Sequence, residues 1–418
     1  MRASIISIGN ELVGGVTVDT NAAWLARELT AVGCEVFEHA TVGDDRSAIA
    51  EAVSSALGRA DLLIITGGLG PTPDDVTREG IADALGVAIK THPDAEGQIR
   101  DFYQKLQRRI TPSGYRQALI PVGCEVIANP WGTAPAFGGR REGCRFFALP
   151  GVPSEMKAIF RAGILPKIVV ETGGRRSATG VVRCFGTSEA SIGEKIADLM
   201  AAERNPKVGV TADEAVISVR ITATGEDEAA ARVAVDADIA EVRKRLGRYV
   251  LGECEATLSS AVAELLKSSR KTIATAESCT GGLLAKSLTD IPGSSAYFLR
   301  GYVTYANEAK TGILGVPEGI LASEGAVSEA VARLMAEGCR RQAGSDFAVS
   351  ITGIAGPGGG EAPDKPVGLV YFGLADERGV FVKQILFGSH LSRNQIRQRS
   401  CRTALNILRL RLIEGDWP

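Results

Sequence analysis

Strands and helices alternate along the first part of the chain, and this alternation restricts the fold more than any other feature. A strand is expected over residues 3–8, and an apolar stripe over residues 22–32 indicates a helix. The pattern continues with a strand over 34–42 and a helix over 47–57. The next strand, Asp61-Leu-Leu-Ile-Ile-Thr66, is apolar almost throughout, as in parallel sheets that are buried on both faces. These residues therefore predict an α/β fold in which a parallel sheet lies between helices.

The C-terminal half shows a second alternation. Residues 271–275 are typical of a strand and apolar residues recur at helical spacing from Leu283, so residues 278–282 form the turn between them. A second strand is expected over 300–307, with a helix starting at its end, and a third strand with its glycine-rich loop spans 347–360. Because open α/β sheets bind ligands where their strands end, we expect the three strand ends to line one crevice.

Ser278 is the candidate nucleophile of this crevice. Tyr305 and Lys310 follow it and provide a phenol and an amine that could accept the serine proton, which is the chemistry of an amide hydrolase. Unpaired N–H groups at the start of the next helix would stabilise an oxyanion. The alternative interpretation is that Ser278 or Thr280 only caps that helix.

Cys279 is the rival nucleophile, because it is adjacent and a thiol is intrinsically more nucleophilic than a hydroxyl. A cysteine mechanism usually needs a histidine partner, and of the three histidines in the chain only His390 lies in the same half. We therefore expect Cys279 to pack or bind rather than to react.

Six motifs follow one another in order through this half: Ala276-Glu-Ser-Cys-Thr-Gly-Gly282, Pro292-Gly-Ser-Ser295, Asn307-Glu-Ala-Lys310, Gly325-Ala-Val-Ser328, Thr352-Gly-Ile-Ala-Gly-Pro357 and Lys365-Pro-Val-Gly368. With these motifs, the half resembles the C-terminal domain of the competence/damage-inducible CinA family. The resemblance implies a deamidase that needs no cofactor and converts nicotinamide mononucleotide to nicotinic acid mononucleotide and ammonia. It assigns catalysis to Ser278, Tyr305 and Lys310. Substrate contacts are expected from Thr280, Gly281, Gly282, Ser294, Asn307, Thr352, Gly353 and Arg397.

In the N-terminal half, the strand that ends at Thr66 opens into a glycine-rich turn, Gly67-Gly-Leu-Gly-Pro-Thr-Pro-Asp-Asp-Val-Thr77. Glycines before a helix suit a phosphate, because the main chain can approach the anion while the helix N-terminus faces it, although the same residues also serve as simple turn formers. Acidic residues gather at the same predicted sheet edge: Glu11, Asp19, Asp44, Asp45, Asp74 and Asp75. Some of them, Asp19 and Asp74 in particular, are expected to cap helices, and the others are candidate oxygen ligands of a divalent cation.

Further motifs accompany this turn: Ile8-Gly-Asn-Glu-Leu12, Thr20-Asn21, Val42-Gly-Asp44, Asn129-Pro-Trp-Gly-Thr-Ala-Pro135 and Leu149-Pro-Gly-Val-Pro153. Together they resemble the molybdopterin-binding-type domain of the same family, which implies ADP-ribose pyrophosphatase activity with a divalent metal. Leu69 departs from the usual Gly-Gly-Thr-Gly, and Asn10 stands where relatives often have Thr or Asp. Asp75 and Asp44 are expected to hold metal or water and Glu11 to be a third metal ligand. Gly67, Gly68, Gly70 and Asn21 are expected to contact the substrate.

Between the halves, two short strands within 207–224 and a helix over 226–246 indicate a small α+β module that resembles the family's KH-like middle domain. It has no Gly-x-x-Gly clamp with basic flanks, so RNA binding is not implied and a spacing or dimerising role is expected. The expected domains are 1–168, 169–252 and 253–418.

The composition sets wider limits. The chain carries 47 basic and 49 acidic residues, so it has no strong overall field for nucleic acid or an anionic membrane. No apolar run reaches membrane-spanning length, and the short one near the N-terminus is expected not to be a signal peptide. Eight scattered cysteines without zinc spacing indicate reduced thiols in the cytoplasm. The family resemblance implies a homodimer.

Three hypotheses about function follow. The chain is a bifunctional pyridine-nucleotide salvage enzyme, with deamidation at one end and ADP-ribose hydrolysis at the other. Alternatively, the N-terminal domain holds a pterin or nucleotide without turning it over, or the chain is an interaction protein of the competence or recombination machinery.

Overall fold

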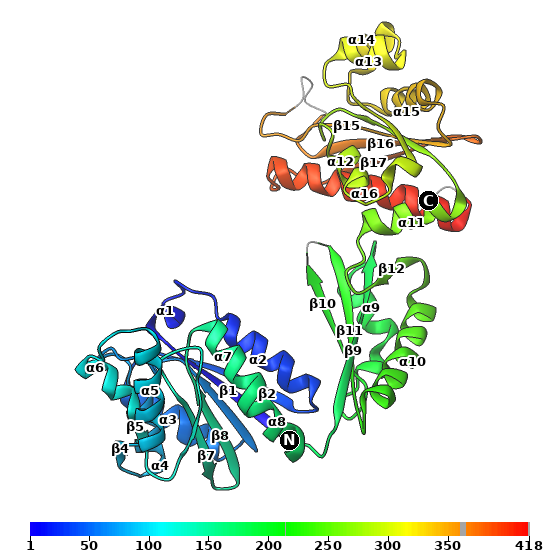
Figure 1. Cartoon of the computed structure of the whole chain (residues 1–418). Coiled ribbons are helices and arrows are strands. Elements are labelled where there is room, and N and C mark those ends of the chain that lie inside the picture. Colours follow the sequence, from blue (N-terminus) through cyan, green and yellow to red (C-terminus); the bar gives the residue numbers. More distant parts are fainter. Residues whose placement is uncertain (214, 360–364, 417–418) are drawn as a thin grey trace. The chain divides into compact units, whose positions relative to one another are not determined.

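The computed structural model describes residues 1–213, 215–359 and 365–416 (Figure 1). Gly360, the expected end of the glycine-rich loop, lies outside the described residues. The chain divides into two compact units, Met1–Thr179 with Thr222–Asp236 and Gly180–Ile221 with Ala237–Pro418. In the described part of the chain, no helix is long and apolar enough to cross a bilayer.

The N-terminal sheet has six strands in the order β2-β1-β3-β8-β7-β6. Four of them pair in parallel, and β7 and β6 complete the sheet with antiparallel pairing. The expectation of an α/β fold built on parallel strands is confirmed. The strands are β1 (Arg2–Ile8), β2 (Glu35–Val42), β3 (Leu62–Thr66), β6 (Glu125–Ile127), β7 (Ala136–Arg141) and β8 (Cys144–Leu149), and β4 (Ile89–Thr91) pairs separately with β5 (Leu119–Pro121).

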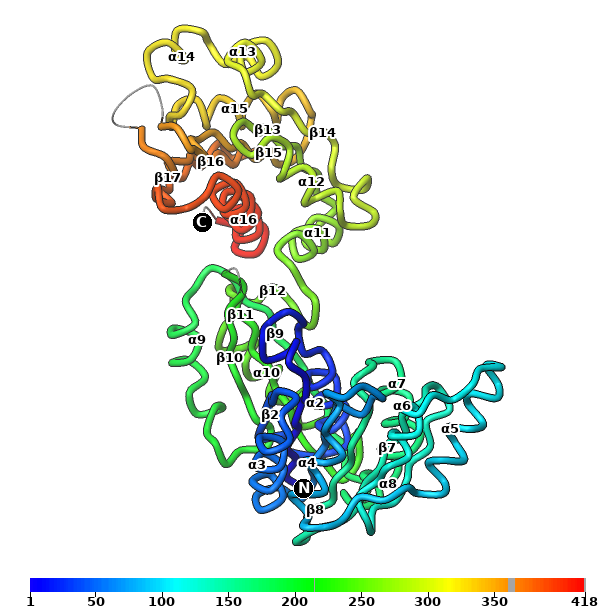
Figure 2. The backbone as a smooth tube through the Cα atoms, turned by 90° about the vertical axis from the view of Figure 1, so that its left-hand side faces the viewer, coloured from blue at the N-terminus to red at the C-terminus, as the bar shows by residue number. Residues whose placement is uncertain are grey.

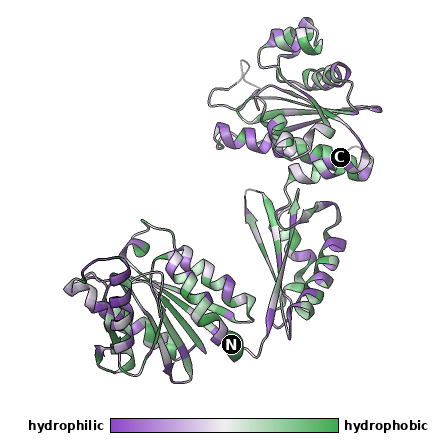
Figure 3. Cartoon of the chain, viewed as in Figure 1, coloured by the Kyte–Doolittle hydropathy of each residue, from purple (hydrophilic) through white to green (hydrophobic). Residues whose placement is uncertain are grey.

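Helices cover both faces of this sheet because its strands are apolar on both sides (Figure 3). Along β1, Ile6 packs into one core and Ile5 into the other, as the period of two in a strand requires. The first core includes residues of α3 (Arg46–Leu57), α4 (Thr77–Leu85) and α5 (Pro93–Lys105), and the second includes residues of α2 (Thr20–Ala31), α7 (Pro153–Ile159) and α8 (Leu165–Glu171). The short helices α1 (Asn10–Val13) and α6 (Pro112–Tyr115) lie in connections.

The middle of the chain forms a four-stranded sheet in the order β10-β11-β9-β12. The expected pair of strands is present as β10 (Lys207–Asp213) and β11 (Val216–Gly225), and the expected helix is α10 (Glu228–Leu246). The remaining elements are β9 (Arg176–Phe185), α9 (Glu189–Lys195) and β12 (Val250–Glu253).

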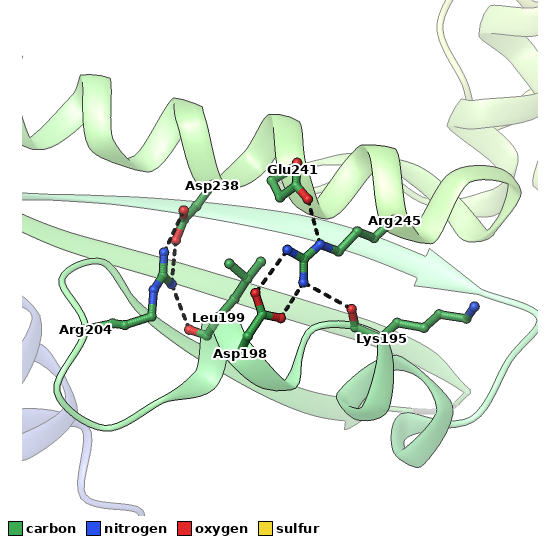
Figure 4. Close-up of polar contacts among 7 residues, drawn as sticks. All are labelled: Lys195, Asp198, Leu199, Arg204, Asp238, Glu241 and Arg245. Atoms are coloured by element: carbon green, nitrogen blue, oxygen red, sulfur yellow. Dashed lines mark hydrogen bonds and ion pairs between the residues drawn. The ribbon is translucent and has the colours of Figure 1, made fainter.

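Two arginines tie α10 to the segment that follows α9 (Figure 4). Arg204 makes a bidentate pair with Asp238, with both distances at 3.0 Å. Arg245 bonds Asp198 and also donates to Glu241 at 2.7 Å. These carboxylates raise the pKa of both arginines, so the network stays charged and fixes the helix.

The C-terminal sheet has five strands in the order β14-β13-β15-β16-β17. Strand β13 (Ile273–Glu277) runs parallel to β14 (Phe298–Val303) and to β15 (Phe347–Gly353). The other two strands, β16 (Leu369–Asp376) and β17 (Gly379–Leu386), are antiparallel. The strand expected over 300–307 ends earlier, at Val303, because its partner β13 ends at Glu277. Beyond that point the carbonyls of Thr304 and Tyr305 accept hydrogen bonds from Lys310.

Helices again lie on both faces, as Figures 1 and 2 show. One face carries α11 (Leu258–Ser269), α12 (Leu283–Thr289) and α16 (Arg393–Glu414). The other carries α13 (Asn307–Leu314), α14 (Glu318–Glu324) and α15 (Glu329–Ala343). The helices cover the two faces of the sheet, and the polar turns lie at the ends of its strands.

A buried ion pair joins α16 to β16. Arg411 Nε lies 2.8 Å from Asp376 Oδ2, and the two side chains are 8% and 3% exposed. We expect Arg411→Met to lower the free energy of unfolding by about 3–5 kcal/mol, because it leaves a buried carboxylate without its partner. Urea denaturation measures this loss. The double variant Arg411→Met with Asp376→Leu should recover much of it, whereas an equal loss in both variants would refute the electrostatic explanation.

Candidate functional site

The parallel strands of the C-terminal sheet end at one edge. In the sheet register, Glu277 pairs with Val303 on one side and with Ile351 on the other. The turn with Ser278, the loop with Tyr305 and the end of β15 therefore follow adjacent strands at the same edge. The expected convergence of three strand ends is confirmed.

Ser278 is the first residue of the turn between β13 and α12, and its N–H donates to Ile351 O at 2.9 Å. Gly281 and Gly282 have φ of +58° and +89°, a backbone conformation that favours glycine. Gly282 is the N-cap of α12 and has no side chain of its own to cap the helix, so the interpretation of Ser278 or Thr280 as the cap is wrong. Thr280 Oγ1 is instead buried, and within the described residues it has no hydrogen-bond partner.

Glu277 performs the capping from the other side of the turn. Its fully buried carboxylate accepts the N–H groups of Leu284 at 3.0 Å and Ala285 at 2.8 Å. The expectation that the first helical N–H groups are unpaired is therefore wrong, because a carboxylate occupies them and is stabilised by the helix dipole. Among the described residues, the turn's own N–H groups at Thr280 and Gly282 have no main-chain acceptor, so these two remain as candidate donors to an oxyanion.

Lys310 lies on the first turns of α13 and is 1% exposed. Its Nζ donates to Thr304 O at 3.1 Å and to Tyr305 O at 3.3 Å. Burial lowers the pKa of Lys310, and the smaller opposing effects come from Cys279 and Glu308. The neutral amine is thus favoured relative to an ordinary lysine.

Tyr305 is 59% exposed, and its hydroxyl accepts a hydrogen bond from Arg393 Nη2 at 2.9 Å. The same guanidinium donates to Gly356 O at 2.6 Å, so Arg393 links two strand ends. One helical turn further on, Arg397 donates to Thr280 O at 2.7 Å. Arg393 was not expected at the site from the sequence, although its spacing of four from Arg397 on one helix places both on the same face.

The other residues expected to contact the substrate do not all lie near Ser278. Asn307 lines a cavity of about 1160 Å³ together with Ile354 and Lys365. Thr352 is buried and donates to Ala326 O at 2.7 Å, and Gly353 follows it at the end of β15. Ser294 precedes β14 and so belongs to the opposite edge of the sheet, where the structure does not bring it to Ser278.

All eight cysteines are free thiols and only Cys254 is exposed. Cys279 is 6% exposed within the core on the α12 face. Burial raises its pKa to about 12, so the reactive thiolate is disfavoured there. The geometry agrees with packing rather than nucleophilic attack by Cys279.

In the N-terminal domain, the glycine turn follows β3 at the edge where β1 and β2 also end. Gly67 and Gly68 have φ of +107° and +63°. A Cβ on Gly67 would lie 2.1 Å from Ile8 O, and one on Gly68 would lie 2.1 Å from Thr77 Oγ1. Both positions therefore require glycine, because the turn packs closely against the end of β1 and the start of α4.

Asn21, the other expected contact, begins α2 beside this turn. Its Nδ2 donates to Gly151 O at 2.8 Å and lies 3.5 Å from Thr66 Oγ1. Its Oδ1 is buried and, in the described part of the chain, has no partner. Asn21 therefore joins the ends of β3 and β8 and has one acceptor left.

The acidic residues at this edge serve different purposes. Asp19 and Asp45 are N-caps of α2 and α3. The expected capping by Asp74 is wrong, because Val76 is the N-cap of α4 and no side chain bonds there. Asp75 accepts Gly70 N at 2.8 Å and Thr72 N at 2.8 Å, so it shapes the glycine turn.

Asp44 and Asn10 bond each other reciprocally, from Asn10 N to Asp44 Oδ2 at 2.8 Å and from Asp44 N to Asn10 Oδ1 at 3.1 Å. Burial raises the pKa of Asp44, as do the nearby carboxylates of Glu11, Asp74 and Asp75. Among the described residues, no three side chains form a preformed metal cluster. Hard oxygen donors are present, and they suit a Mg²⁺-like ion that one or two carboxylates share with substrate phosphates.

Three family models cover the chain in succession. A probable molybdopterin binding domain matches residues 4–169, a damage-inducible protein CinA KH domain matches 179–252, and a CinA C-terminal domain matches 255–412. A CinA-like protein of Geobacter metallireducens is 44% identical over 99% of this chain and 100% of its own length. A putative competence-damage inducible protein of Symbiobacterium thermophilum is 40% identical over 99% of each. The architecture is that of a three-domain α/β protein with a KH domain in the middle. The chain belongs to the CinA family.

Solved structures match part of the chain. The CinA protein of unknown function from Thermoplasma acidophilum is 39% identical, with 40% of this chain and 97% of that chain covered and a TM-score of 0.38. The competence/damage inducible protein CihA from Agrobacterium tumefaciens is 44% identical, with 36% and 91% covered and a TM-score of 0.35.

The capping role of Glu277 is testable. We expect Glu277→Gln to lower the free energy of unfolding by about 1–2 kcal/mol, because the amide keeps only one acceptor for two buried N–H groups. Urea denaturation followed by circular dichroism measures the change. Glu318→Gln, at an exposed position in the first turn of α14, is the matched control. Equal stability of the two variants would show that the carboxylate is not needed as a cap.

Proposed function

We propose that the C-terminal domain hydrolyses the carboxamide of nicotinamide mononucleotide and releases nicotinic acid mononucleotide and ammonia. The proposal takes its substrate from the family motifs around Ser278, Tyr305 and Lys310. The observation that carries the chemistry is the buried Lys310 amine at the sheet edge of Ser278.

The hydrogen bonds of Lys310 favour its neutral amine, the form that can act as a base. A neutral amine has two N–H groups and one lone pair, and two main-chain carbonyls already accept from Nζ. A protonated amine would have a third N–H without a partner in a site that is 1% exposed. The lone pair of the neutral Lys310 amine is therefore free to accept a proton.

In this mechanism, Lys310 takes the proton of Ser278 Oγ, directly or through Tyr305, and Oγ bonds to the carboxamide carbon. The N–H groups of the turn hold the oxyanion. The carbon–nitrogen bond then breaks, and ammonia leaves with the proton that returns from the base. Water finally hydrolyses the acyl-serine ester to the acid. No cofactor takes part, and Arg393 holds the hydroxyl of Tyr305 in place.

We propose that Thr280, Asn307 and Arg397 contact the ribose and phosphate of the nucleotide. Arg397 supports this role because its guanidinium already reaches the nucleophile turn. An arginine fork suits phosphate oxygens. Thr352 and Gly353 end the third strand and contribute to the same crevice.

A second activity is proposed for the N-terminal domain, which hydrolyses ADP-ribose to AMP and ribose 5-phosphate. Support comes from the glycine turn at the end of β3, whose conformation only glycine adopts readily, and from the carboxylates beside it. A divalent ion bound by Asp44, Asp75 or Glu11 would neutralise diphosphate charge. A pterin- or nucleotide-binding module without turnover is the alternative, as is an interaction protein of the competence machinery.

We further propose that the protein is a cytoplasmic homodimer that binds neither nucleic acid nor membrane.

The two activities should separate by mutation. We expect Ser278→Ala to abolish ammonia release and to leave ADP-ribose hydrolysis intact, and Asp75→Ala to do the reverse, since the residues belong to separate sheets. Ammonia and AMP are measured on the purified full-length protein, with and without a chelator. Ammonia release should survive chelation. Loss of both activities from either change in a folded protein would contradict separate sites.

The lowered pKa of Lys310 predicts a pH profile. Only the neutral amine accepts a proton, so kcat/KM should rise with pH through the lowered pKa and level off below the ordinary lysine value of 10.5. A continued rise up to that value would argue against a buried base.

Lys310→Met is expected to reduce turnover by about 10²–10⁴-fold. It should not reduce stability, because the folded state disfavours the charge that the unfolded state carries. Keeping Lys310 neutral in the folded wild type costs free energy of unfolding, and this cost grows as pH falls from 10.5 through the lowered pKa. The stability of the variant relative to the wild type should therefore increase toward lower pH. Urea denaturation at two pH values tests this, and a less stable variant would contradict it.

A further inference from the structure

Arg78 lies directly beneath the glycine turn of the N-terminal domain. It is the second residue of α4, and its side chain is 1% exposed. Its guanidinium donates from Nη1 to Leu69 O at 2.7 Å and from Nη2 to Gly70 O at 2.8 Å. One buried fork therefore holds two consecutive carbonyls of the turn.

This buried cation has no carboxylate in contact. Among the described residues, no ion pair within 4.0 Å includes Arg78, and its Nε has no hydrogen-bond partner. The adjacent Glu79 pairs with Arg116 instead, at 3.3 Å. Burial lowers the pKa of Arg78, and the more distant charges of Glu79 and Asp75 raise it. A buried charge without a direct counterion is costly and needs a compensating interaction.

The carbonyl bonds also orient the turn. Gly67 O accepts from Thr77 Oγ1 at 3.0 Å, so this carbonyl faces α4 together with those held by Arg78. The N–H and C=O of one peptide unit point in opposite directions, so the Gly68 N–H faces away from α4. In the described part of the chain this N–H has no acceptor. The turn thus presents a free donor outward while a positive charge lies behind it.

We propose that Arg78 is a positioning residue for a diphosphate group, whose negative charge it attracts while it holds the glycine turn in the binding conformation. The inference rests on the proposed function of the N-terminal domain and assigns its diphosphate to this turn. The carboxylates of Glu11, Asp44, Asp74 and Asp75 oppose an anion here. Binding is therefore expected to need a divalent cation as well.

The test is calorimetric titration of full-length protein with inorganic pyrophosphate in the presence of MgCl₂. Arg78→Met should weaken binding by about tenfold or more, because it removes both the charge and the fork. Arg78→Lys keeps the charge but loses the fork, so its affinity should lie between those of the wild type and Arg78→Met. Arg409→Met is the control, since it removes another arginine that is 1% exposed and bonded to a carbonyl, in the second compact unit.

A folded Arg78→Met protein that binds pyrophosphate like the wild type would overturn the proposal, as would a wild type that does not bind it. Should Arg78→Met fail to fold, the pyrophosphate affinities of Arg78→Gln and Arg78→Lys are compared instead. Tighter binding by Arg78→Lys than by Arg78→Gln supports the role of charge, and equal binding by the two variants rejects it. A wild type that binds pyrophosphate through Arg78 but does not hydrolyse ADP-ribose would refute the proposed activity and leave this inference intact.

Discussion

Parallel pairing of strands is the constraint on which both candidate sites depend. In the C-terminal sheet, β13 pairs in parallel with β14 and β15, and in the N-terminal sheet β1 pairs in parallel with β2 and β3. Parallel strands bring their carboxyl ends to one edge, so the turns that leave them are neighbours whatever their separation along the chain. The edge gathers polar residues while the apolar faces bind the helices.

Charged side chains that are buried or partly buried shape the turn at each edge. In the C-terminal domain a carboxylate, Glu277, accepts the N–H groups of the following helix and an amine, Lys310, donates to carbonyls. In the N-terminal domain Asp75 accepts N–H groups of the turn and Arg78 donates to its carbonyls. A side chain that is taken out of water must find such partners, so the main chain of each turn is fixed by them. The groups left without partners are the ones available to a ligand.

Much of this arrangement could be predicted. The strand over residues 61–66 is apolar on both faces, which requires helices on both sides, and β3 (Leu62–Thr66) lies between them. The turn at 278–282 follows from glycines between a strand and an apolar helical pattern, and both glycines have positive φ. The expectation that the strand reaches Asn307 was wrong because its partner strand β13 ends at Glu277, and propensity does not record where a partner ends.

Local patterns of apolar residues, glycines and acidic residues by themselves determined the fold class, the turns at the strand ends and the family, because these features depend on neighbouring residues. The tertiary structure alone decided which charged groups are buried and what they contact. Arg78, Arg393 and Glu277 look in the sequence like ordinary surface charges. Arg78 and Glu277 are nevertheless buried, and the partners of all three arise from residues brought together by the sheet, since desolvation and hydrogen bonding depend on the surroundings of a group in space.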